Sequence, residues 1–255
     1  MKTIVVLCVQ RSGSSILAGM LHHLGVFMGR NRDLKKGKHA NKPGCFENQK
    51  FLSLSHTILY DAGSSAIYYE FPEEEKIEEM VKKFDPEITA LVKRFDNKAL
   101  WGWKDPVSYQ IIPYIHGSLE NPHYIFLYRE IENVVESIKK MSSNKNILPA
   151  LMHELSLYQK WRRKTGIFRR MYRIYKTRGN IIHEDDFVNN FLVQAYNKIE
   201  SFVEGKKHLR IDFNDLIDDT AGSIDKIADF LGEDFSKKSR KQALDFLHPD
   251  LINFK

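Results

Sequence analysis

The chain has 255 residues, of which 42% are hydrophobic and 28% are charged, and this composition excludes a disordered chain and supplies enough apolar material for a core. Its 39 lysines and arginines outnumber its 33 aspartates and glutamates, and the net charge of +6 suits an anionic ligand, acceptor or surface. Cys8 and Cys45 form no disulfide framework or zinc-type pattern. No stretch approaches the roughly 20 apolar residues of a membrane span, and the first residues lack a signal-peptide cleavage site. We therefore expect a cytoplasmic protein.

A strand, a turn and a helix are the first predicted elements. The run "TIVVLCV", residues 3–9, is continuous and β-branched, which is typical of a strand buried on both faces. From Ser14 onward apolar residues recur at helical spacing, and Gly25 is a suitable helix end. Residues 29–50 are basic and rich in turn formers, so we expect most of them to form a loop.

Helix and strand patterns alternate along the rest of the chain. A helix is predicted from about Asn48 to Tyr60, and another over residues 72–84 with Pro72 at its start. The later strand candidates are "KALWGWKD" (98–105), "HYIFLYRE" (123–130) and "HLRIDFNDL" (208–216), and the later helices run through 134–141, from about 148 to 202, and over 223–232. The alternation favours a parallel α/β sheet of about four or five strands.

The turn "QRSGSS" after the first strand has the features of an anion-binding loop. Free backbone N–H groups and the helix dipole concentrate positive charge there, and Gly13 permits close approach of the backbone. Arg11 adds a full charge, and Ser12, Ser14 and Ser15 can donate hydroxyls, so the loop suits a phosphate or sulfate group. The alternative is a plain turn with serine as the helix cap. The pattern G-x-x-x-x-G-K-S/T occurs nowhere in the chain, which disfavours ordinary Mg-ATP chemistry.

A second basic residue and hydroxyl follow a later strand candidate. Arg129 stands at the end of residues 123–130, and Ser137 lies about two helical turns further on. The two side chains can flank a second phosphate. Taken alone, such a pair is more often a surface arginine and a helix serine.

Five segments, "VQRSGSSILAGML", "PGCFENQKF", "WGWKDP", "FLYREIENVVESI" and "HLRIDFNDLIDDTAGSIDKIADFLG", together resemble the family of sulfotransferases that depend on 3′-phosphoadenosine 5′-phosphosulfate. The first is similar to that family's 5′-phosphosulfate loop and the fourth to its 3′-phosphate element. The others resemble a Phe-Glu segment of bacterial-type members, a Lys-Asp-Pro strand end, and the closing strand and helix. The resemblance implies one sulfotransferase domain over residues 1–255, α/β in class, with a central parallel sheet flanked by helices in a P-loop-like topology.

The same resemblance implies a donor site made of Arg11, Ser12, Gly13, Ser14, Ser15, Arg129 and Ser137. The product would be adenosine 3′,5′-bisphosphate, and no metal is expected, because the donor carries no triphosphate to neutralise.

Three residues are expected to carry the chemistry. Arg11 would stabilise the leaving phosphate oxygen, and Lys104 would hold the bridging oxygen or the sulfuryl group. Glu47 is the first choice of general base, with His56 and Asp105 as alternatives. Plainer interpretations are a surface lysine at 104, a helix-terminal acid at 47, and an aspartate that only orients the lysine.

The acceptor is expected to be a hydroxyl or amine on a carbohydrate or other small molecule. Residues 160–178, "KWRRKTGIFRRMYRIYKTR", have nine basic residues and no acid, with aromatic residues between them. An amphipathic helix is the simpler interpretation. Within a helical, acceptor-flanking segment at about 145–205, the same pattern favours an acidic acceptor or peripheral contact with an anionic membrane surface, and no nucleic acid is expected.

Two other classes of protein stay open at this point. One is a nucleoside or small-molecule kinase with an atypical phosphate loop, which would prefer ATP with Mg²⁺. The other is a non-catalytic nucleotide-binding module, which would bind the bisphosphate without turnover.

Overall fold

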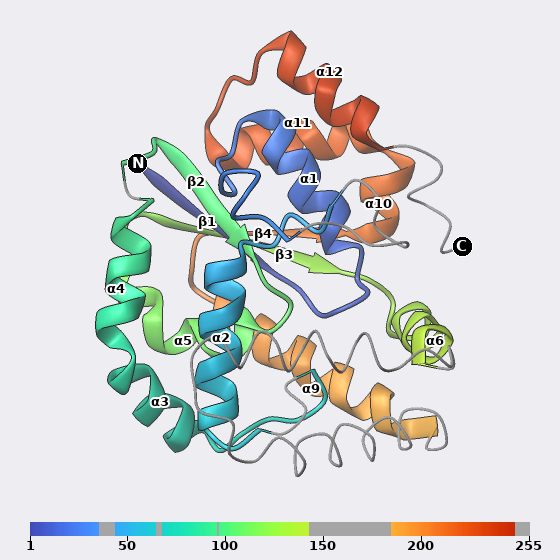
Figure 1. Ribbon diagram of the computed structural model, residues 1–255. Coiled ribbons are helices and arrows are strands. Elements are labelled where there is room, and N and C mark those ends of the chain that lie inside the picture. The colour runs from blue at the N-terminus through green and yellow to red at the C-terminus, as the bar shows by residue number, and fades with distance from the viewer. Residues whose placement is uncertain (36–43, 65–67, 96, 143–184, 248–255) are drawn as a thin grey trace.

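A four-stranded sheet forms the centre of the structure, a computed structural model that describes residues 1–35, 44–64, 68–95, 97–142 and 185–247 (Figure 1). The strands are β1 (Lys2–Leu7), β2 (Leu100–Lys104), β3 (Pro122–Tyr128) and β4 (His208–Asp212). They lie in the order β2-β1-β3-β4, and every neighbouring pair is parallel. The predicted α/β class with a central parallel sheet is therefore confirmed.

Helices cover both faces of this sheet (Figure 1). Ile4 and Val6 of β1 pack into one hydrophobic cluster and Val5 and Leu7 into the other, because successive strand side chains point to opposite faces. The helices on the Ile4 side are α1 (Ser14–Leu24), α10 (Phe213–Asp218), α11 (Thr220–Leu231) and α12 (Lys237–Phe246). Those on the Val5 side are α2 (Gln49–Asp61), α3 (Glu74–Lys83), α4 (Asp85–Lys93), α5 (Ile112–Ile115), α6 (Ile131–Ser142) and α9 (Asp185–Val203), with the short turns η1 (Ser108–Gln110) and η2 (His116–Ser118) beside α5.

The strand order brings the loops after β1 and β3 together at the carboxyl ends of the strands. The chain runs from β1 to β2 on one side and then returns to β3 on the other side of β1. Ligands of open parallel sheets bind beside the carboxyl ends of the strands, where the order reverses in this way. The loops after β1 and β3 therefore meet at the position where this fold class forms its sites.

Several predicted element boundaries differ from the structure. The strand predicted over 208–216 ends at Asp212, because the Asp212 carboxylate accepts a hydrogen bond from the Asn214 N–H at 2.8 Å and starts α10. Pro72 lies before the helix cap Glu73 and is not the first residue of α3. Sequence analysis also missed α4, α5 and α12. Of the helix predicted from 148 to 202, only the part within α9 belongs to the described residues.

Candidate active site

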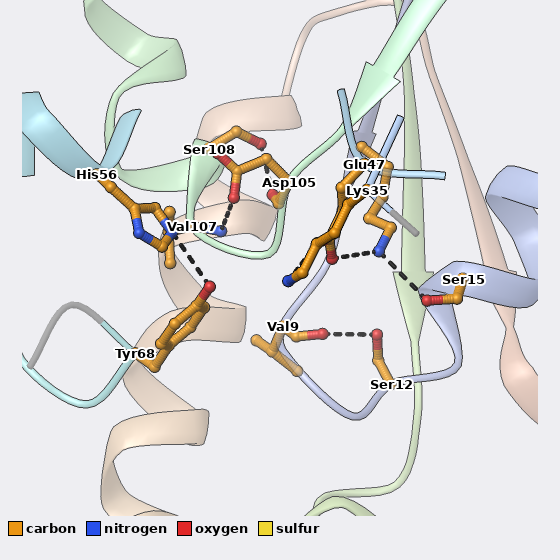
Figure 2. Close-up of polar contacts among 11 residues, drawn as sticks. Val9, Ser12, Ser15, Lys35, Glu47, His56, Tyr68, Asp105, Val107 and Ser108 are labelled. Atoms are coloured by element: carbon orange, nitrogen blue, oxygen red, sulfur yellow. Dashed lines mark hydrogen bonds and ion pairs between the residues drawn. The ribbon is translucent and has the colours of Figure 1, made fainter. Parts of the chain in front are cut away.

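The loop after β1 is held in a strained, open turn. Arg11 has a φ of 63° and Gly13 a φ of 88°, both left-handed, and the Ser12 hydroxyl donates to the Val9 carbonyl at 2.8 Å (Figure 2). Gly13, and not a serine, is the N-cap of α1, so the cap residue has no side chain that could accept a hydrogen bond from the helix. The alternative of a serine-capped turn is therefore wrong, and the first turn of α1 keeps N–H groups for a ligand.

Phe213 of α10 explains why position 13 is glycine. A Cβ atom at Gly13 would lie 2.1 Å from Cε2 of the Phe213 ring, so only glycine fits there. The same ring lies under Arg129, with the guanidinium carbon 4.6 Å from the ring centroid. Phe213 thus packs against both the predicted anion loop and the second predicted basic residue.

The two predicted arginine–serine pairs come together at this sheet edge. Arg11 Nε donates to Ser137 Oγ of α6 at 3.0 Å, and Arg129 Nη1 donates to the Arg11 carbonyl at 3.0 Å. Tyr196 of α9 holds the Arg129 backbone, since its hydroxyl donates to the Arg129 carbonyl at 2.9 Å and accepts from the Arg129 N–H at 3.3 Å. Three helices and two strand ends therefore fix one basic site.

Charge in this site is arranged for an anion. Burial in the first place, and the neighbouring Arg129 charge in the second, lower the pKa of Arg11. Burial also lowers the pKa of Arg129. The two partly buried guanidinium groups repel each other, and anionic groups bound to them would offset that repulsion.

Glu47 forms ion pairs with two lysines, the buried Lys104 of β2 and the partly exposed Lys35. Lys104 Nζ lies 2.7 Å from Glu47 Oε1, and Lys35 Nζ lies 2.9 Å from Glu47 Oε2. Lys104 Nζ also donates to Ser15 Oγ of α1 at 3.4 Å. The Lys104 side chain is only 1% exposed, so the interpretation as a surface lysine is wrong.

The Glu47 carboxyl is held in its charged form. Burial alone would raise the pKa of Glu47, but the charges of Lys104 and Lys35 outweigh burial and lower the pKa to about 2. Asn48, and not Glu47, is the cap of α2, because its side chain accepts from the Lys50 N–H at 3.1 Å. Glu47 is therefore the shared counter-ion of two lysines and a weak proton acceptor in this arrangement.

Asp105 and His56 lie on the Glu47 side of the anion loop, farther from the loop than Glu47 itself (Figure 2). Burial raises the pKa of Asp105 to about 7, against the effect of the hydrogen bond that its Oδ1 accepts from the Val107 N–H at 3.1 Å. The His56 ring is buried, and its Nε2 lies 3.1 Å from the Tyr68 hydroxyl. Of the two predicted carboxylate bases, Asp105 has the pKa that better suits proton transfer near neutrality.

Some functional residues were missed at the level of sequence. Lys35 lies in a basic loop where nothing distinguishes it from neighbouring lysines, and Phe213 and Tyr196 come from segments assigned only to the closing strand and a variable helix. Residues 160–178 lie outside the described residues, as does most of the predicted acceptor segment 145–205.

In the part of the chain that the structure describes, no group of three or more histidine, cysteine, aspartate and glutamate side chains could hold a metal ion. No helix in the described ranges has the length and apolar character needed to cross a bilayer. The expectations of metal independence and of a cytoplasmic location stay predictions.

Comparisons with known proteins agree with the resemblance. A model of the sulfotransferase family matches residues 3–237. Among solved structures, the chain is similar to the sulfotransferase domain from the curacin biosynthetic pathway, with 16% identity and a TM-score of 0.46 over 92% of this chain and 75% of that one. It is also similar to the sulfotransferase domain of the Synechococcus PCC 7002 olefin synthase, with 19% identity and a TM-score of 0.44 over 100% of this chain and 83% of that one. A sulfotransferase from Alicyclobacillus acidocaldarius is similar with 11% identity and a TM-score of 0.46 over 100% of this chain and 94% of that one. No curated protein matches.

Proposed function

Because this chain belongs to the sulfotransferase family, we propose that it transfers a sulfuryl group from 3′-phosphoadenosine 5′-phosphosulfate to a hydroxyl or amine of an acceptor. The observation that carries the proposal is the convergence of Arg11, Arg129 and Ser137 with the uncapped start of α1. Such a site suits a ligand with separate anionic groups, which is the chemical character of this donor.

The described residues fit the donor at both of its anionic ends. The left-handed turn at Arg11 and Gly13 and the first turn of α1 would bind the phosphosulfate end. Arg129 and Ser137 would bind the 3′-phosphate, and the Phe213 ring supports both parts from below. The donor supplies an activated sulfuryl group, whose transfer leaves negative charge on a phosphate oxygen.

Lys104 and Arg11 would stabilise that charge. Lys104 already reaches the anion loop through Ser15 Oγ, and it is buried, so its charge acts in a medium of low dielectric constant. Arg11 lies on the opposite side of the same loop, beside α6. We assign to these two residues the task of holding the leaving oxygen and the sulfuryl group in line.

Three residues are candidates for the general base. Glu47 was the first choice, and that assignment stays a prediction, although its two ion pairs make it a poor proton acceptor. Asp105, with its pKa near 7, and His56 are the alternatives. Replacing each of the three residues and recording the pH dependence of kcat identifies the base, because loss of the base removes the acidic limb of the profile.

The acceptor is proposed to be an acidic carbohydrate or other acidic small molecule, because of the basic segment 160–178. Reversing the charge of Arg169, Arg170 and Arg173 should raise the acceptor KM steeply and leave the donor KM unchanged. Equal loss for donor and acceptor would reject an acidic acceptor.

A labelled-sulfate assay against a panel of hydroxyl and amine acceptors tests the proposed function. It is run beside two calorimetric titrations, one with adenosine 3′,5′-bisphosphate in the presence of a chelator and one with ATP in the presence of Mg²⁺. Binding of the bisphosphate and transfer of label to at least one acceptor would support the proposal. Binding of ATP with Mg²⁺ in preference to the bisphosphate would refute it in favour of a kinase, and binding without any transfer would indicate a non-catalytic module.

A further inference from the structure

Two lysines share the single carboxylate of Glu47, and they differ in exposure. The side chains of Lys104 and Glu47 are 1% and 8% exposed, whereas that of Lys35 is 25% exposed. A pair of opposite charges would already satisfy Glu47. The second lysine is therefore an addition that the ion pair itself does not require.

The backbone fixes Lys35 opposite Glu47 without help from Lys104. The Lys35 N–H donates to the Glu47 carbonyl at 2.8 Å, and the Cys45 N–H donates to the Lys35 carbonyl at 3.3 Å. Beside them, the Gln49 N–H donates to the Asp33 carbonyl at 2.8 Å. Segments 33–35 and 45–49 thus form a short antiparallel pairing that keeps the second ion pair in place when the first one breaks.

Lys104 has a competing partner on its other side. Its Nζ donates to Ser15 Oγ at 3.4 Å, in the loop that would bind the phosphosulfate group. A donor anion at that loop would draw Lys104 away from Glu47. Without Lys35, this exchange would separate the buried carboxylate from both lysines that pair with it in the described residues, which is strongly unfavourable.

We propose that Lys35 is a positioning residue that keeps Glu47 paired while Lys104 turns to the donor. The inference rests on the proposed function and assigns a role to a residue outside the donor-binding loops. Two ammonium groups and one carboxylate have one net positive charge. When Lys104 turns to the donor, Lys35 neutralises Glu47, and the positive charge of Lys104 stabilises the leaving group.

The proposal has consequences for pH dependence. Among the described residues, the charged or titratable groups around Glu47 and Lys35 include Lys104, Asp105, Cys8 and Cys45. Removing the Lys35 charge takes away one of the two cations that lower the pKa of Glu47, so Glu47 becomes protonated at higher pH. The acid-dependent loss of stability that Glu47 causes should then begin at higher pH in K35M than in wild type.

Lys35→Met, Lys35→Arg and the control Lys82→Met test the proposal, with kcat measured on an acceptor found in the labelled-sulfate panel. Lys82 is a matched control, since it pairs with Glu78 at 2.7 Å on α3, away from the site. In K35M we expect kcat to fall about tenfold to a hundredfold, the scale of one charge-assisted hydrogen bond, while K35R and K82M stay close to wild type. Calorimetric affinity for adenosine 3′,5′-bisphosphate should change by less than about twofold, because that affinity comes from the arginine sites.

A second background separates positioning from folding. In Glu47→Gln, where no carboxylate charge is left to hold, adding K35M should not lower kcat further. The proposal is overturned if K35M keeps the wild-type kcat, or if it lowers bisphosphate affinity as much as kcat. A wild-type protein that neither binds the bisphosphate nor transfers sulfate refutes the proposed function, and this inference with it.

Discussion

The substitution Gly13→Ala tests how tightly the anion loop is packed. The Gly13 φ of 88° is left-handed, and a new Cβ would lie 2.1 Å and 2.3 Å from two carbons of the Phe213 ring. A left-handed non-glycine residue costs about 1–2 kcal/mol, and an overpacked contact costs about 1–3 kcal/mol. We therefore expect G13A to lose about 2–5 kcal/mol of unfolding free energy.

Urea denaturation with Gly63→Ala as a control separates the two contributions. Gly63 has a φ of 104°, and no atom of the described residues lies within 4 Å of a Cβ placed on it, so we expect G63A to carry mainly the backbone strain. The difference between the variants, about 1–3 kcal/mol, measures the contact with Phe213.

The same variant links packing to ligand binding. Phe213 also supports Arg129, so displacement of its ring should lower bisphosphate affinity in G13A and leave it unchanged in G63A. Phe213→Leu should restore part of the stability of G13A, because the smaller side chain leaves room for the methyl group. If G13A and G63A lose equal stability and bind the bisphosphate alike, the close packing described for this loop is incorrect.

Two carboxylates give opposite pH dependences. The folded state stabilises the charged form of Glu47, so Glu47 adds about 3 kcal/mol to the free energy of unfolding above pH 4.5, and this is lost as the pH falls toward 2. In Glu47→Gln, urea denaturation should no longer show this acid-dependent part of the free energy of unfolding. Asp105 behaves in the opposite way, because burial favours its protonated form and stability is lost as the pH rises from about 4 through 7. Asp105→Asn should therefore match wild type near pH 4 and exceed it by up to about 4 kcal/mol near pH 8, and an unchanged difference across that range would contradict the buried position of the carboxyl.

Local patterns were sufficient to predict the parts of the fold that depend on neighbouring residues. The β-branched run of β1 is buried on both faces, and Gly25 ends α1 in a left-handed conformation, as the sequence indicates. The strand order, by contrast, follows from packing between distant segments. The predicted end of β4 was wrong because hydrophobic residues continue past Asp212 into α10, and only the cap geometry shows where the strand stops.

The parts of the site that lie within one continuous segment could be predicted from the sequence, and the contacts between distant segments could not. Arg11 and Gly13 belong to one loop, and Arg129 and Ser137 to one strand–helix unit. The pairing of Glu47 with Lys104 and Lys35 joins three segments, and no spacing in the sequence reports it. For the same reason the low pKa of Glu47, which works against its predicted role as a base, could not be foreseen.

The central claim is that Arg11 and Arg129 bind opposite ends of one nucleotide. Calorimetry with adenosine 3′,5′-bisphosphate and adenosine 5′-monophosphate, on Arg11→Met and Arg129→Met, tests it most directly. We expect R129M to lose about tenfold to a hundredfold in affinity for the bisphosphate and almost nothing for the monophosphate, which lacks the 3′-phosphate, whereas R11M weakens both. Equal losses for the two nucleotides in R129M, or no binding of the bisphosphate to the wild-type protein, would contradict the account.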